Sequence, residues 1–179
     1  MRQLNHLLNR TVTYSRLQAF HRSSNEHSFQ IARIQNRVPV PLELARGHAP
    51  YVGQEVWFVE DQSDPTILSY RYVYGPDPTS EGGWICRYEY STTNPRGYQY
   101  DRAHLHVNVS ELGGRVAGKV FKKLHFPTGF VRLEQVLLHL IVEWDVPVLE
   151  DALRPDARDE ALAVLRERLA NSPRSAVEP

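Results

Sequence analysis

The sequence predicts an α+β domain, in which an antiparallel β-sheet from residues 53 to 126 is covered by a buried helix at about 129–144. Two observations lead to this prediction. After residue 53, β-branched and aromatic residues alternate with polar ones in short segments, as is typical of strands. From Phe130 to Trp144, apolar residues instead recur at helical spacing. The strands follow one another without intervening helices, which argues against a parallel α/β fold.

Composition and charge narrow the class of protein. The chain has 179 residues, 41% of them hydrophobic, enough to bury a core in one domain. Its 21 basic and 21 acidic residues balance, but arginine is in excess before residue 50 and no acid lies between residues 113 and 132. This asymmetry permits an anionic partner. A single cysteine, Cys86, excludes an intrachain disulfide. Without an apolar leader or a membrane-spanning run, we expect a cytoplasmic protein with no membrane partner.

The first 50 residues are predicted to form a basic arm of helical or irregular structure. A loose helical period is given by Leu4, Leu7, Leu8 and Val12. Residues 38–41, Val-Pro-Val-Pro, favour an extended connection that is poor in strand. The arginines of the arm fit either a solvated surface or a binding site for nucleic acid or an acidic protein.

Two aromatic-rich segments, residues 66–74 and 84–90, are expected to pair as antiparallel strands. Their apolar side has a period of two and comprises Tyr70, Tyr72 and Tyr74 in the first segment and Trp84, Cys86, Tyr88 and Tyr90 in the second. Such a stripe is more typical of a sheet face than of a platform for stacking bases. The same alternation puts Arg87 and Glu89 on the other side.

Helical signals dominate the end of the chain. Thr128 is the expected N-cap of the 129–144 helix, and His139 within that helix is expected to be a hydrogen-bonded or an edge residue rather than a ligand. A last helix is predicted to begin near Pro155, with acidic residues early and arginines late. The predicted organisation is a basic arm at 1–50, an α+β core at 51–147, and a C-terminal helix and tail at 148–179.

Three histidines are the strongest candidates for chemistry. His104 and His106 are two residues apart in a predicted strand and should therefore project from the same face. His125 follows 19 residues further on. Imidazoles placed together can share a metal, exchange protons or bind phosphate; they are also compatible with an ordinary half-exposed strand.

A metal site is one hypothesis. His104-Leu-His106, four residues, Glu111, six residues and Gly118 resemble the core of the first cupin motif. The resemblance implies zinc or iron held by His104, His106 and Glu111. The second cupin motif is missing, because Arg132 stands where its histidine should be.

Cleavage of RNA without a cofactor is another hypothesis. A histidine pair that acts as base and acid, beside a cation that stabilises the phosphate, is sufficient to cleave RNA through its 2′-hydroxyl. The catalytic candidates are His104, His106 and His125. The candidates for substrate binding are Arg87, Arg102, Lys122, Lys123 and Tyr88.

A family resemblance points in the same direction. Arg87-Tyr-Glu89, a polar loop, His104-x-His106 and Leu124-His-Phe-Pro-Thr-Gly129, followed by a helix, resemble the small TumE-type toxins of bacterial toxin–antitoxin pairs over about residues 66–146. Glu89 stands where that family usually has aspartate. The resemblance implies a cytoplasmic toxin with RNA as its target and a helix-turn-helix antitoxin as its partner. A non-catalytic module that binds nucleic acid or protein remains the alternative, and the oligomeric state is left open.

Overall fold

The computed structural model describes residues 1–21, 28–44, 49–57, 66–80, 83–92, 103–108, 115–116, 119–120, 123–149 and 154–171. Within these residues it confirms the α+β class, with three helices and an antiparallel sheet. The sheet follows the order β1-β2-β4-β5-β6-β7-β10, and β3 pairs with β2. Its strands are β1 (Gln18–His21), β2 (Ser28–Gln35), β3 (Val38–Val40), β4 (Ala49–Trp57), β5 (Thr66–Gly75), β6 (Cys86–Ser91), β7 (Ala103–Asn108) and β10 (Lys123–Pro127).

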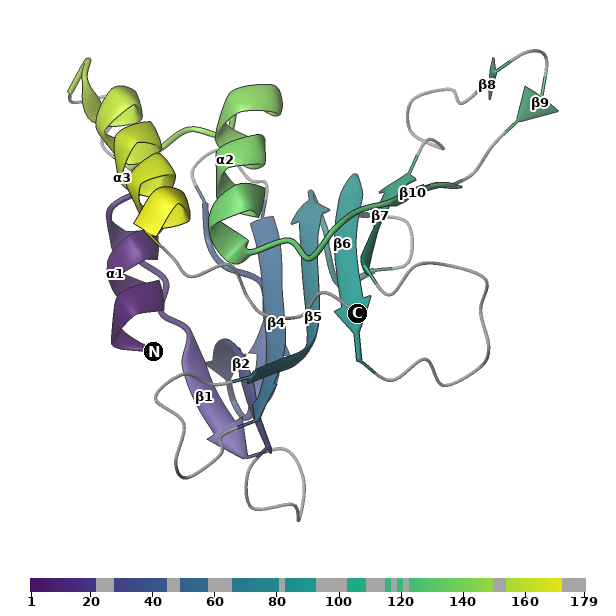
Figure 1. Ribbon diagram of the computed structural model, residues 1–179, viewed down its shortest axis with the longest axis horizontal. Coiled ribbons are helices and arrows are strands. Elements are labelled where there is room, and N and C mark those ends of the chain that lie inside the picture. The colour runs from purple at the N-terminus through teal and green to yellow at the C-terminus, as the bar shows by residue number, and fades with distance from the viewer. Residues whose placement is uncertain are drawn as a thin grey trace.

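Three helices lie together on one side of this sheet (Figure 1). They are α1 (Arg2–Asn9), α2 (Leu133–Glu143) and α3 (Ala157–Asn171). Two very short strands, β8 (Arg115–Val116) and β9 (Lys119–Val120), pair with each other and project beyond the β10 end of the sheet (Figure 1).

The predicted tyrosine stripe forms the side of the sheet that faces the helices. Tyr70 and Tyr72 on β5 stack with ring centroids 4.6 Å apart. The edge of the Phe130 ring packs on Tyr70 at 5.4 Å, and the hydroxyl of Tyr70 accepts a hydrogen bond of 2.9 Å from the backbone N–H of Val131. Burial raises the pKa of Tyr70 to about 12, so this hydroxyl stays neutral and serves packing.

Helix α2 begins later than the sequence predicted. Thr128 is not its N-cap: residues 128–132 are not helical, and the helix starts at Leu133 with Arg132 as the capping residue. The side chain of Gln135 accepts a hydrogen bond of 2.8 Å from the backbone N–H of Arg132, which satisfies that donor outside the helix. Because Phe130 packs on the sheet from this non-helical segment, tertiary packing overrides its helical spacing.

The first 50 residues contain more strand than the sequence predicted. Among the described residues of this region (1–21, 28–44 and 49–50), α1 is the only helix, while β1, β2 and β3 join the main sheet and β2 pairs with β4 across the predicted boundary at residue 50. Asn36 and Arg37 both have positive φ, 52° and 65°, as the tight hairpin between β2 and β3 requires. The sequence did not predict this hairpin, because Arg37 stands where such a turn usually has glycine.

The C-terminal helix packs on α2. A guanidinium N–H of Arg132 donates to the backbone carbonyl of Leu169 at 3.0 Å, and Nε of Arg168 lies 3.3 Å from the carboxylate of Glu134. Leu162 and Leu165 of α3 are buried. None of the helices in the described part of the chain is long and apolar enough to cross a membrane.

Candidate functional site

The face of the sheet opposite the tyrosine stripe carries two rows of side chains that cross neighbouring strands. Strand register places Arg71 on β5 beside Glu89 on β6, and Glu89 beside His104 on β7. In the next row, Arg87 on β6 is paired with His106 on β7. Because residues two apart in a strand share a face, the rows are adjacent on the same surface.

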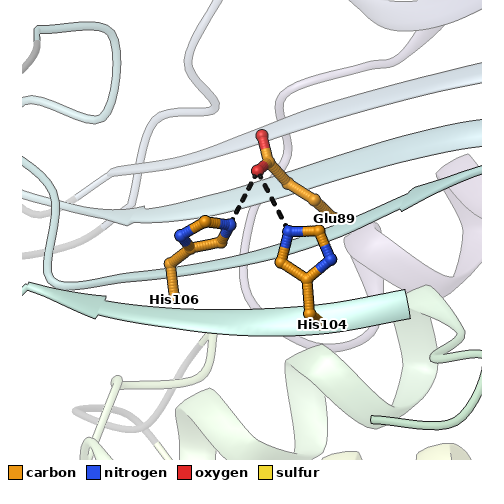
Figure 2. Close-up of side chains that lie close together, drawn as sticks. All are labelled: Glu89, His104 and His106. Carbon is orange, nitrogen blue, oxygen red and sulfur yellow. Dashed lines mark ion pairs between the residues drawn. The ribbon is translucent and has the colours of Figure 1, made fainter. Parts of the chain in front are cut away.

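Glu89 is the centre of this cluster. One carboxylate oxygen, Oε2, lies 3.0 Å from Nε2 of His106 and 3.8 Å from Nε2 of His104. Figure 2 shows both rings projecting from one strand toward this oxygen, while Glu89 reaches over from the neighbouring strand. The same oxygen lies 3.1 Å from a guanidinium nitrogen of Arg87, and Oε1 lies 3.4 Å from Nε of Arg71. Four partners from three strands therefore converge on one carboxylate.

Burial differs among the members of the cluster. The side chain of His106 is 8% exposed, those of His104 and Glu89 are 21% and 27% exposed, and that of Arg71 is 53% exposed. Burial opposes ionisation of Glu89, but the close contact with Nε2 of His106 and the charges of Arg87 and Arg71 outweigh it. The pKa of the Glu89 carboxyl therefore lies below its ordinary value.

Trp84 packs against Arg87 and His106 and departs from the predicted alternation. It was expected on the tyrosine side, but the guanidinium carbon of Arg87 lies 5.0 Å from the centre of its ring. The rings of Trp84 and His106 meet edge to face at 6.4 Å. β6 begins only at Cys86, so Trp84 is not bound by the alternation of the strand. Burial lowers the pKa of Arg87, and contact with the indole face compensates part of its lost hydration.

Of the predicted site residues, the structure brings His104, His106 and Arg87 together. The backbone pairing of β10 with β7 places His125 opposite His106 and Lys123 opposite Asn108. The side chains of His125 and Lys123 lie outside the described part of the structure. Arg102, Lys122 and Glu111 lie outside the described residues.

Tyr88, predicted to bind substrate, lies on the opposite side of the sheet. It is 8% exposed, and its hydroxyl is hydrogen-bonded to Nδ1 of His139 on α2. Burial raises the pKa of Tyr88 to about 12 and lowers that of His139. The pair joins α2 to the sheet, which fits the hydrogen-bonded role expected for His139.

Two residues of the cluster were not among the predicted site residues. Glu89 and Arg71 occupy the polar positions of strands whose other side is tyrosine, and directly opposed charges on paired strands attract. That alternation was visible in the sequence. Their pairing across the sheet was not, because strand register depends on loops whose length and path no local pattern fixes.

The chain matches no protein-family model, no curated protein and no solved structure. Histidine nitrogens and a carboxylate oxygen within 4.8 Å of one another are a donor set for a metal ion. A carboxylate, imidazoles and guanidinium groups on one surface are equally a set for proton transfer at a phosphate.

Proposed function

We propose that the protein is a metal-independent ribonuclease and that the reaction takes place on the surface formed by Glu89, His104 and Arg71. One observation carries the proposal: a carboxylate with a lowered pKa is surrounded by two arginines and two histidines on the face of the sheet opposite the helices. These are the groups that transesterification of RNA requires, namely a base, an acid and cations for the phosphate.

Exposure assigns the roles of base and acid. Glu89 and His104 are 27% and 21% exposed, whereas His106 is 8% exposed, so the first two can reach a substrate. In the proposed reaction Glu89 takes the proton of the ribose 2′-hydroxyl and the 2′-oxygen attacks phosphorus. The bond from phosphorus to the 5′-oxygen breaks, and His104, as the general acid, donates a proton to that oxygen. His106 is a positioning residue, because its Nε2 holds the carboxylate at 3.0 Å.

The arginines bind the phosphate in this mechanism. Arg71 is 53% exposed and presents a guanidinium group, which matches phosphate geometry. In the free protein Arg71 and Arg87 lower the pKa of Glu89, which weakens it as a base. When the guanidinium groups turn toward a substrate phosphate, the carboxylate loses these partners and becomes more basic. Substrate binding thereby activates Glu89.

The balance of charge favours an anion over a metal cation at this site. Glu89 contributes one negative charge, whereas Arg71 and Arg87 contribute two positive charges within 3.4 Å of it. A phosphate is attracted to the excess positive charge. A divalent cation would be repelled by it.

A metal centre is the second candidate, because the ligand atoms of Glu89, His104 and His106 lie within 4.8 Å of one another. Zinc ligands at about 2.1 Å in tetrahedral geometry are about 3.4 Å apart, between the observed 3.0 and 3.8 Å. Two histidines and a carboxylate also suit non-haem iron. A rise in melting temperature on adding zinc or ferrous iron, lost in Glu89→Gln, would favour this candidate.

Toxin activity is proposed from the TumE resemblance of residues 66–146. Expression of the protein should arrest bacterial growth, and expression of Glu89→Gln at the same level should not. A small helix-turn-helix protein from a neighbouring gene should restore growth as the antitoxin. Unimpaired growth with the unmodified protein would remove the toxin assignment.

The test of the ribonuclease activity compares two oligonucleotides of one sequence, RNA and DNA, incubated with purified protein in EDTA. Because the 2′-hydroxyl is the proposed nucleophile, the RNA should be cleaved to products with a 2′,3′-cyclic phosphate and the DNA should stay intact. Intact RNA under these conditions would refute the proposed activity. Cleavage of both the RNA and the DNA oligonucleotide would refute attack by the 2′-hydroxyl.

A further inference from the structure

The surface that carries Glu89 extends onto β4, where Tyr51 and Gly53 face the same way as the cluster. Tyr51 is paired with Val73 on β5, and Gly53 is paired with Arg71. Arg71 is in turn paired with Glu89. The row of catalytic groups therefore continues to a glycine, and the tyrosine stands two residues before that glycine on the same strand face.

The hydroxyl end of the Tyr51 ring lies over Gly53. A Cβ atom at residue 53 would be 3.1 Å from Cε1, 3.5 Å from the hydroxyl oxygen and 3.6 Å from Cζ of Tyr51. The ring thus leans along the strand toward the row that contains Arg71. A Cβ atom at residue 53 would force the ring to shift by a few tenths of an ångström, so glycine favours this close approach.

An aromatic ring that lies over a strand glycine also has a purely structural role, because it covers backbone that a side chain would otherwise protect. Two features favour a binding role here. The ring is half-buried rather than enclosed, and it stands beside Arg71, which is 53% exposed and is the proposed phosphate ligand. Neighbouring strands are about 4.8 Å apart, so the ring and Glu89 are separated by about two strand spacings, a span that one nucleotide bridges.

We infer that Tyr51 forms a subsite for an unpaired nucleobase next to the phosphate bound by Arg71. Every base presents a π-face, so stacking on a tyrosine strengthens binding with little dependence on sequence. A base held there is unpaired, and the substrate is therefore single-stranded RNA. This inference rests on the proposed ribonuclease function and adds to it a substrate class and a base-binding residue.

The experiment measures kcat and KM for a single-stranded RNA oligonucleotide in EDTA with the unmodified protein, Tyr51→Phe and Tyr51→Leu. Phenylalanine keeps the ring, whereas leucine keeps an apolar cover over Gly53 without a π-face. Tyr51→Leu should raise KM about 10-fold with little change in kcat, and Tyr51→Phe should retain the original KM. The same change at Tyr14, which is 63% exposed and lies outside the sheet, should leave KM unchanged.

The outcomes separate the subsite from the enzyme. If Tyr51→Leu cleaves RNA with the KM of the unmodified protein, the base subsite is wrong and the ribonuclease stands. A loss shared by Tyr51→Phe and Tyr51→Leu would also refute stacking, since the ring is retained in the first. If the unmodified protein neither binds nor cleaves RNA, both the subsite and the proposed function fall. Equal melting temperatures of the three proteins would exclude misfolding as the cause of a KM change.

Discussion

Glu89 and His106 meet diagonally across two paired strands. Register places Glu89 directly opposite His104 and Arg87 opposite His106, yet Oε2 of Glu89 is closer to Nε2 of His106, at 3.0 Å, than to that of His104, at 3.8 Å. The diagonal contact divides the histidines into two environments. His106 holds the carboxylate and is almost buried, while His104 keeps an exposed edge from which a proton can be transferred.

Replacement of Glu89 by glutamine should lower the rate of RNA cleavage by about 10²–10⁴. Glutamine preserves the shape of the side chain but cannot accept the proton of the 2′-hydroxyl. The rate should be measured with saturating RNA in EDTA, and the fold checked by circular dichroism. A variant within about threefold of the unmodified rate would show that Glu89 is not the base.

The pH dependence should differ between the free protein and the complex. Glu89 has a lowered pKa in the free protein because of His106, Arg87 and Arg71, so the acid limb of kcat/KM should fall below the ordinary glutamate value of about 4.3. The acid limb of kcat should lie at higher pH, because the arginines then contact phosphate. Coincident limbs would contradict activation of Glu89 by substrate.

Leu137→Ala should reduce the free energy of unfolding by about 2–5 kcal/mol, because Leu137 on α2 is 1% exposed in the hydrophobic core and its truncation leaves a cavity. Val142 on the same helix is 45% exposed, so Val142→Ala is the matched control and should change stability by about 0.5 kcal/mol or less. Denaturant melts provide the measurement. Equal effects of the two substitutions would mean that α2 is peripheral.

The Tyr88–His139 contact predicts an acid-sensitive attachment of α2. Burial lowers the pKa of His139, so the folded protein keeps the ring neutral, whereas the unfolded chain takes up a proton below about pH 6.5. The unfolded state then binds more protons, and stability should fall as the pH drops through that value. His139→Gln should weaken this dependence between pH 7 and pH 5. An unchanged slope of stability against pH would show that other groups cause it.

Much of the fold follows from local alternation in the sequence. The period of two in β5 and β6 assigned Tyr70, Tyr72 and Tyr74 to one side and Arg87 and Glu89 to the other, and the structure agrees. The same alternation places Tyr88 on the side of the sheet opposite the histidines. The prediction that Tyr88 binds substrate together with them was therefore inconsistent with the predicted strand. Trp84 does not follow the alternation because it precedes the first residue of β6.

The sequence did not predict which residues of neighbouring strands are in contact. Glu89 lies in β6 and His106 in β7, and their pairing depends on a connection of residues 92–102 that has no periodic pattern. Near the N-terminus, Phe29 and Ile31 alternate with polar residues in β2, but surrounding arginines and the unusual Asn36-Arg37 turn concealed the hairpin. Local chemistry identified which residues face together, and long-range register determined which of them touch.

We propose that this cluster cleaves RNA without a metal. The most direct measurement is the rate of RNA cleavage by one preparation before and after exhaustive EDTA dialysis, with its zinc and iron content determined by mass spectrometry. The mechanism predicts an unchanged rate and metal well below one ion per chain, since Glu89, His104 and Arg71 supply all the required groups. Near-stoichiometric metal that is absent from His104→Ala, with activity lost on dialysis, would contradict it.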